Sequence, residues 1–228
     1  MKYKLTDRNG RTYGDTQWGP GVRHAAVGKG SDLCSDGWIH FYDDPLLAVL
    51  LNTIGADYHD AQLWEFQPEG EQKHDRGVKS GSKAGTTLRE IPLPLITPEQ
   101  RIRFGILAAW EVRANWDSAE WCRWAKDWLA GRDCAEVQAH DAAYHTAKAA
   151  AAYAASNAAA RAASAASAAY TAVCAAYAIT LADVAGYAAY AAAAAAASAA
   201  SAVAAADATE ASSINLAQLA KQAMQEVS

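Results

Sequence analysis

Proline and glycine are nearly absent from the second half of this sequence. All six prolines lie at or before Pro98, and the only glycine between Asp133 and Asp207 is Gly186. Both residue types interrupt helices, so their absence removes the usual obstacles to a long helix. The same stretch is mostly alanine, which is the best helix former. The sequence therefore predicts a turn-rich N-terminal part followed by an all-helical remainder.

Several catalytic and metal-binding patterns are also missing. The four cysteines are widely spaced and form no CxxC pair, which favours free thiols over disulfides or a zinc site. There is no Gly-x-Ser-x-Gly elbow and no His-Glu-x-x-His helix, and the loop Gly28–Ser31 lacks the spacing of a phosphate-binding loop. We therefore expect neither a metal ion nor a cofactor.

The charge balance and the N-terminus exclude further classes. A net charge of −5 disfavours a general nucleic-acid binder, which usually carries a basic face. The first residues, Met1–Asp7, contain no apolar signal core, so we expect a cytoplasmic protein. Two uncharged stretches, Ala162–Ala182 and Val184–Ala206, are long enough to span a membrane, but alanine and serine are poor membrane residues. A membrane hairpin is therefore the disfavoured alternative.

The alanine stretch is too long for an ordinary single helix. One helix from Cys134 to Ala206 would be roughly 110 Å long. Thr180 and Asp183 resemble a helix start, so we predict an antiparallel hairpin of helices Cys134–Ile179 and Leu181–Ala206, with a rod or a kinked helix as alternatives. Larger side chains at three- and four-residue spacing form one stripe, which predicts self-packing or oligomerisation rather than docking of a foreign helix. The stripe consists of Tyr170, Val173, Tyr177, Leu181 and Val184.

The N-terminal part alternates short strand-like segments with turns. Asp43-Asp44-Pro45 predicts the start of a helix with the apolar body Leu46–Leu51. Gly70–Gly85 is polar, rich in glycine and contains Lys79 and Lys83. It predicts a solvated loop, with a site for an anionic ligand as the alternative. The expected strands are Tyr3–Thr6 paired with Arg11–Tyr13 across an Asn-Gly turn, Val22–Ala26, Gly37–Tyr42, Leu63–Gln67 and Thr86–Ile91.

Three further helices are expected. Thr97–Gln100 has the pattern of a capping box and starts a helix that reaches about Arg113. A second runs from about Ser118 to Ala130 with a tryptophan face, and a short tail helix follows Ser213. The predicted fold is α+β, with a small mixed domain over residues 1–96, connecting helices over 97–132 and an alanine-rich helical region over 133–228.

Four segments of the N-terminal part carry a resemblance to known proteins. They are Tyr3–Asp7, Leu33–Tyr42, Pro45–Ala48 and Leu88–Ile91. Over roughly the first hundred residues the chain resembles a group of bacteriophage proteins that share a domain of unknown function, whose members often append a low-complexity tail. The resemblance implies a phage accessory protein in the host cytoplasm and brings no known activity with it.

These observations leave three functional hypotheses. The leading one is a non-enzymatic accessory, host-interaction or anti-defence protein that binds a protein partner and self-associates through its alanine helices. The second is enzymatic: a glycine followed by a strand with a histidine and then a helix resembles part of ADP-ribosyltransferase-like folds. That resemblance implies a nucleotide ligand at His40, with Tyr13, Tyr42 and Glu65 as companions, although no second glutamate motif accompanies it. The third is a structural component of the virion.

Overall fold

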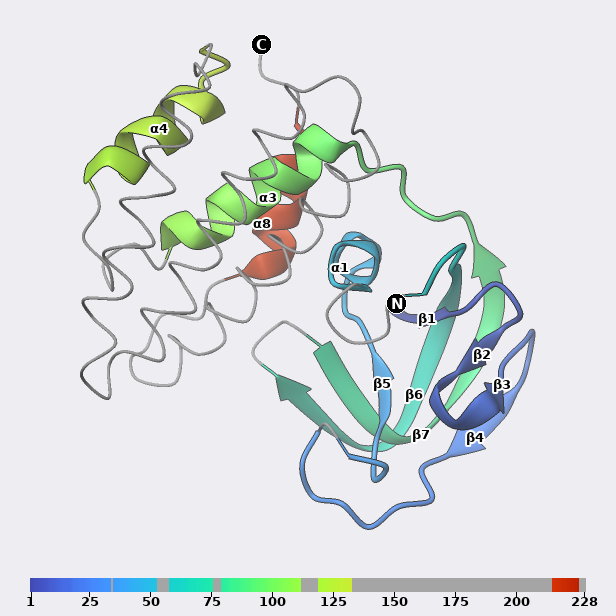
Figure 1. Ribbon diagram of the computed structural model, residues 1–228. Coiled ribbons are helices and arrows are strands. Elements are labelled where there is room, and N and C mark those ends of the chain that lie inside the picture. Colours follow the sequence, from blue (N-terminus) through green and yellow to red (C-terminus); the bar gives the residue numbers. More distant parts are fainter. Residues whose placement is uncertain (34, 53–57, 76–78, 112–118, 133–214, 226–228) are drawn as a thin grey trace. The chain divides into compact units, whose positions relative to one another are not determined.

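The computed structural model describes residues 1–33, 35–52, 58–75, 79–111, 119–132 and 215–225 (Figure 1). The chain divides into two compact units, Met1–Leu95 and Ile96–Ser228. The predicted helical hairpin and its stripe from Tyr170 to Val184 lie outside the described residues.

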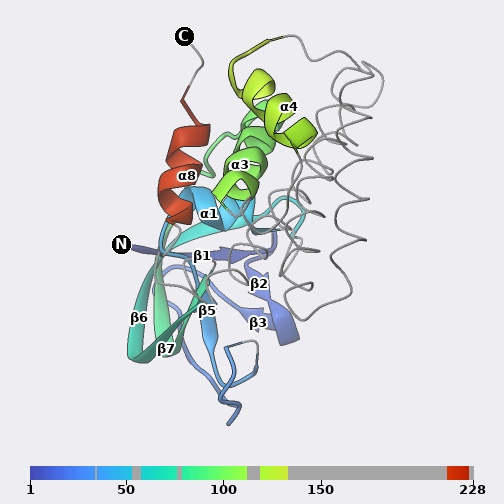
Figure 2. The same ribbon diagram turned by 90° about the vertical axis from the view of Figure 1, so that its left-hand side faces the viewer.

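The first unit is an antiparallel sheet that closes on itself. The long strands β6 and β7 form its centre, β1 pairs with β6, and both β4 and β5 pair with β7. Tyr3 of β1 and Tyr42, which directly follows β5, exchange two backbone hydrogen bonds of 2.9 and 2.7 Å. The strands therefore form a ring in the order β1, β6, β7, β5, which Figures 1 and 2 show from two sides. The bounds are β1 Lys2–Thr6, β4 Arg23–Ala25, β5 Ile39–Phe41, β6 Gln62–Asp75 and β7 Lys79–Ile91.

The expected pairing between the first two strands is wrong. The second strand, β2 (Arg11–Thr12), pairs with β3 (Thr16–Gln17) across the 3-10 turn η1 (Tyr13–Asp15). β1 pairs with β6 over all five of its residues, and its other edge is bonded to Tyr42 at Tyr3. The Asp7 carboxylate accepts the amides of Asn9 and Arg11 at 2.8 and 2.7 Å and turns the chain there.

The expected loop over Gly70–Gly85 is also wrong, because most of it belongs to β6 and β7. Ser80 and Ser82 of β7 are buried opposite Phe41 and Ile39, and their small side chains suit the narrow interior of a closed ring. Gly70 has a φ of 76° and lies where the pairing register of β6 shifts, so it takes a backbone conformation that other residues adopt at a cost. The predicted strand Thr86–Ile91 is confirmed as the end of β7.

The ring interior is aromatic. Trp18, Ile39, Phe41 and Phe66 form its buried cluster, with ring centroids 5.5 Å apart for Phe41 and Phe66. A second cluster lies on the outer side of the sheet, where Leu5 and Leu63 contact Ala48 of α1; the cluster also includes Tyr3, Tyr42, Tyr58, Ala61 and Ile91.

The predicted helix after β5 is confirmed as α1 (Pro45–Leu50). The Asp44 carboxylate accepts the amide of Leu46 at 2.9 Å and caps the helix, with Pro45 at its first position.

The second unit contains the helices α3 (Pro98–Glu111), α4 (Ala119–Leu129) and α8 (Leu216–Ala223). The predicted capping box is confirmed, because Thr97 and Gln100 each accept the other's amide, at 3.2 and 2.9 Å. The tail helix starts later than expected, with Asn215 as its cap; Ser213 lies outside the described residues.

Helices α3 and α8 pack together in the second unit through buried faces that include Phe104, Ile106, Leu216 and Leu219. In α4, Trp124 of the predicted tryptophan face is buried. None of the helices in the described ranges combines the length and the apolar character needed to cross a membrane.

Gly85 provides a test of how tightly the ring is packed. A methyl group at this position would overlap the Phe66 ring and the carbonyl of Gln67. Gly85→Ala should therefore lower the free energy of unfolding by about 1–3 kcal/mol, measured by urea denaturation. Gly19→Ala is the matched control, because a methyl group there meets only a Val22 methyl at 3.6 Å. Equal effects of the two substitutions would show that the Phe66 contact does not limit residue size at position 85.

Candidate functional site

His40 is the centre of the predicted ligand site, and its imidazole is hydrogen-bonded to another residue of the chain. Ile39 and Phe41 on either side point into the ring interior, so His40 lies on the opposite face of β5. Its Nε2 atom donates a hydrogen bond to the carbonyl of Leu33. Since a carbonyl only accepts, the proton lies on Nε2 in the neutral ring, and this atom is not available to a ligand.

The surroundings of His40 favour the neutral ring. Burial lowers the pKa of His40, and the positive charges of Lys79 and Lys4 lower this pKa further, while the bond to Leu33 opposes them. Lys79 and His40 are thus neighbours, as a shared site would require. When they are protonated, Lys79 and Lys4 give the His40 imidazole a positively charged surrounding.

Two lysines of the long hairpin hold a neighbouring loop. Lys83 donates to the carbonyl of Gly37 at 3.0 Å, and Lys73 donates to that of Ser31 at 2.8 Å. Both ammonium groups also lie over the Trp38 ring, at 3.8 and 5.7 Å from its centroid. With His40 on the Leu33 carbonyl, these donors fasten the segment from Ser31 to Gly37 onto the sheet. The basic residues thus bind carbonyls of their own chain.

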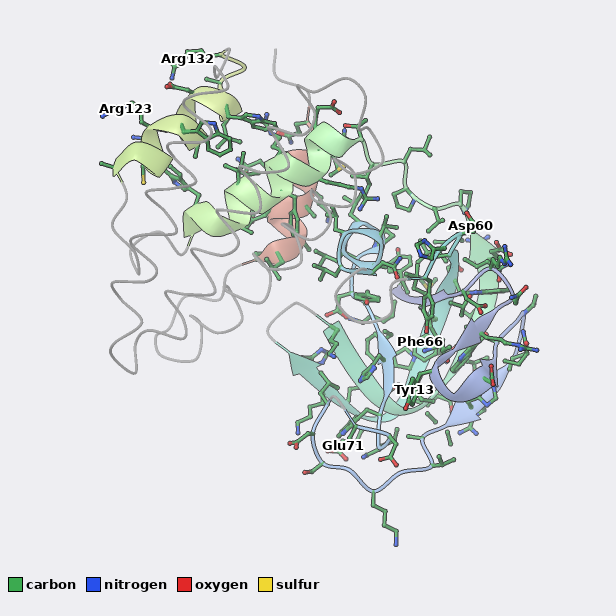
Figure 3. All side chains as sticks on the ribbon, viewed as in Figure 1. Tyr13, Asp60, Phe66, Glu71, Arg123 and Arg132 are labelled. Atoms are coloured by element: carbon green, nitrogen blue, oxygen red, sulfur yellow. The ribbon has the colours of Figure 1, made fainter. Side chains whose placement is uncertain are left out.

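The predicted tyrosines occupy opposite environments. The Tyr42 ring is largely buried, and burial together with Tyr58 raises the pKa of Tyr42 to about 12. A hydroxyl with this pKa remains protonated at neutral pH. Tyr13 is 97% exposed on η1, and its backbone is hydrogen-bonded to Tyr58. Tyr58 therefore connects the Tyr42 region to the turn that carries the exposed Tyr13, which Figure 3 labels.

Glu65 is held by Arg89 on the neighbouring strand. The two nitrogens of Arg89 donate to the two carboxylate oxygens at 2.9 and 2.6 Å. This contact is the main reason that the pKa of Glu65 is lowered. A general acid needs the opposite shift, so this carboxylate is arranged as a structural anion. The predicted set thus divides among separate contacts: His40 with Lys79, Lys83 with Gly37, Tyr42 and Tyr13 through Tyr58, and Glu65 with Arg89.

The sequence reasoning assigned no role to a polar cluster where β1, β5, β6 and β7 meet. Asp43 accepts a 2.6 Å bond from Lys2 and a 3.3 Å bond from Ser80, and His74 contacts Ser80 at 2.8 Å. Ser80 is 1% exposed, which excludes it as a nucleophile in this arrangement. Lys2, Asp43 and the nearby pair His74 and Ser80 come from three distant parts of the sequence, so no local pattern identifies the cluster. Within the described ranges, no three histidine, cysteine or acidic side chains are grouped as metal ligands.

Lys4 is the second feature that sequence reasoning missed. It is 5% exposed, donates to the His40 carbonyl at 3.0 Å and lies 4.4 Å from the centroid of the Trp18 ring. Its neighbours Tyr3 and Leu5 on β1 face the outer cluster, and successive strand residues point to opposite faces. This alternation is the one signal in the sequence that places Lys4 on the inner face.

The bond from His40 to Leu33 predicts a measurable role in fastening the loop. His40→Ala should lower the free energy of unfolding by about 1–3 kcal/mol, because the Leu33 carbonyl loses its donor. It should also increase amide exchange at Ser35 and Gly37. His59→Ala is the control, since His59 is exposed and should change stability by less than about 0.5 kcal/mol. Indistinguishable exchange in the two variants would contradict the fastening role.

Comparison with known proteins found no matching family model, no curated protein of significant similarity and no similar solved structure.

Proposed function

We propose that this chain acts by binding a protein partner, without catalysis, and that the turn carrying Tyr13 makes the contact. The proposal includes the phage accessory or host-interaction role that the sequence suggests. The observation that carries it is the 97% exposure of Tyr13 on a turn whose backbone is held by the rest of the domain. An exposed aromatic ring on a rigid turn gains contact area on binding and loses little conformational entropy.

Several contacts hold the Tyr13 turn in place. The Trp18 indole, anchored in the ring interior, donates to Thr12 Oγ1 at 2.9 Å at the start of the turn. At its end, Thr16 Oγ1 donates to the Tyr13 carbonyl at 3.2 Å. Gly14 and Asp15 have positive φ values of 69° and 55°, which fix a tight reversal between β2 and β3. The turn therefore presents the Tyr13 ring in a constrained position.

The contacts of the other predicted residues support binding over catalysis. His40, Glu65 and Lys83 all form hydrogen bonds with their own chain, to Leu33, Arg89 and Gly37. A nucleotide bound through the His40 Nε2 atom would first have to displace the Leu33 carbonyl. The alternative of a nucleotide-processing enzyme centred on His40 thus requires a rearrangement that the binding proposal does not.

Self-association through the alanine-rich segment is the second part of the proposal and rests on the sequence. Alanine side chains bury little area each, so long helices of this composition need a close neighbour along their length. The spaced stripe from Tyr170 to Val184 supplies the larger contacts.

Photo-crosslinking tests the Tyr13 contact. The chain carries p-benzoylphenylalanine in place of Tyr13 or, as the control, in place of Glu71, an exposed residue elsewhere on the domain (Figure 3). A discrete protein adduct should form from position 13 and not from position 71. For the captured protein, Tyr13→Ala should weaken binding at least about 30-fold, as expected for a central aromatic contact, while Glu71→Ala should not. Unchanged affinity of the Tyr13 variant, or equal adducts from both positions, would refute the assignment.

Light scattering of the full chain over a concentration series tests self-association. The apparent mass should rise with concentration above that of one chain. Leu181→Asp should raise the dissociation constant at least about tenfold, because it buries a carboxylate in the contact. Ser164→Asp, a substitution outside the stripe from Tyr170 to Val184, should have a smaller effect. A single-chain mass at every concentration would remove this part of the proposal.

A further inference from the structure

The ring of strands closes at one short seam between β1 and β5. The seam consists of the two backbone hydrogen bonds between Tyr3 and Tyr42. Elsewhere the ring is held by longer ladders, with five paired positions between β1 and β6 and three between β5 and β7. The seam is therefore the place where the fewest backbone bonds must break to open the ring.

Lys4 lies beside this seam and reaches across it. It belongs to β1, and its ammonium donates to the carbonyl of His40 on β5 at 3.0 Å. The same ammonium lies over the Trp18 and Phe66 rings, 4.4 and 5.7 Å from their centroids. The residue is 5% exposed, so water does not solvate the charge as it would on the surface.

The elements around Lys4 supply no negative charge to it. The ion pairs among the described residues include none with Lys4. On its own strand, Lys2 pairs with the Asp43 carboxylate at 2.6 Å, and on β5 the titratable group is His40, which Lys4 affects through its positive charge. Trp18, Trp64, Phe66, Ser80 and Ser82 on this face are neutral. Two titratable rings contact this group: His74 lies 2.8 Å from Ser80, and the His24 ring centroid lies 4.6 Å from that of Trp18.

Burial therefore acts on Lys4 without compensation by a carboxylate. It lowers the pKa of Lys4 from 10.5 to about 7. When the seam opens, the side chain reaches water and regains an ordinary lysine pKa. The open form then binds more protons than the closed form between pH 7 and 10.5, so closure becomes more stable as the pH rises through this window.

We propose that Lys4 is a proton-sensitive element of the seam, and that protonation of its amine favours separation of β1 from β5. The neutral amine fits the aromatic interior and still donates to the His40 carbonyl. The ammonium keeps that bond and the ring contacts, but it lacks the hydration and the counter-charge that an exposed lysine has. Lowering the pH from 10.5 towards 7 therefore loosens the ring at the seam.

Two measurements test this proposal on the full chain. The first is the titration of the Lys4 ¹³Cε signal, which should change near pH 7. The second is amide exchange at Tyr3 and Tyr42, corrected for the intrinsic rate. Their protection should rise about 100-fold between pH 6 and 9, as the two pKa values require. A Lys4 signal that titrates above pH 10, or protection that does not rise, would overturn the proposal.

Variants separate Lys4 from other titrating groups. Lys4→Met keeps the length and removes the charge, so protection at the seam should no longer depend on pH. Lys4→Gln serves the same purpose if the methionine variant does not fold. Lys2→Met is the control and should retain the pH dependence of the wild type. A pH dependence that persists in both Lys4 variants would assign the effect to another group and refute the role of Lys4.

Discussion

The narrow interior of the closed ring is the constraint on which the rest of the first unit depends. The ring is formed by the strands β1, β6, β7 and β5, and the space that they enclose holds Trp18, Phe41 and Phe66. Large aromatic side chains fit there only if the facing strand carries small ones. β7 meets this need with Ser80 and Ser82 on its inner face and with Gly85 beneath Phe66. A strand composed this way has little intrinsic β-propensity. Its pairing with β6, β5 and β4 holds it in place.

The same constraint explains why the basic and catalytic-looking residues turn inward to their own chain. Leu33, which belongs to the loop before β5, lies against Gly81 of β7. The described residues of this loop, 31–33 and 35–37, do not belong to a strand, so their carbonyls need donors from elsewhere. Lys73, Lys83 and His40 provide them. Residue types that suggest an anion site or a nucleotide site in the sequence thus satisfy backbone carbonyls in the fold.

Local patterns in the sequence predicted what local contacts determine. The Thr97–Gln100 capping box and the cap at Asp44 involve residues two or three positions apart, and both form as expected. The partner of β1 was not predictable in this way, because Tyr3 meets Glu65 and Tyr42 from distant parts of the chain. The β-structure in Gly70–Gly85 was missed for a related reason: its polar, glycine-rich composition indicates a loop unless the aromatic side chains it must accommodate are known.

The candidate site shows the same limit. Residue type singled out His40 and Glu65, but their partners Leu33 and Arg89 determine what they can do, and those contacts are tertiary. Lys4 escaped notice because a lysine on a short strand is usually exposed. Its burial is a cost that an apolar residue of similar length would avoid. Retaining an amine there makes the closure of the ring respond to protons in a way that methionine could not. The feature least expected from composition thus gives the domain a property that its packing alone would not supply.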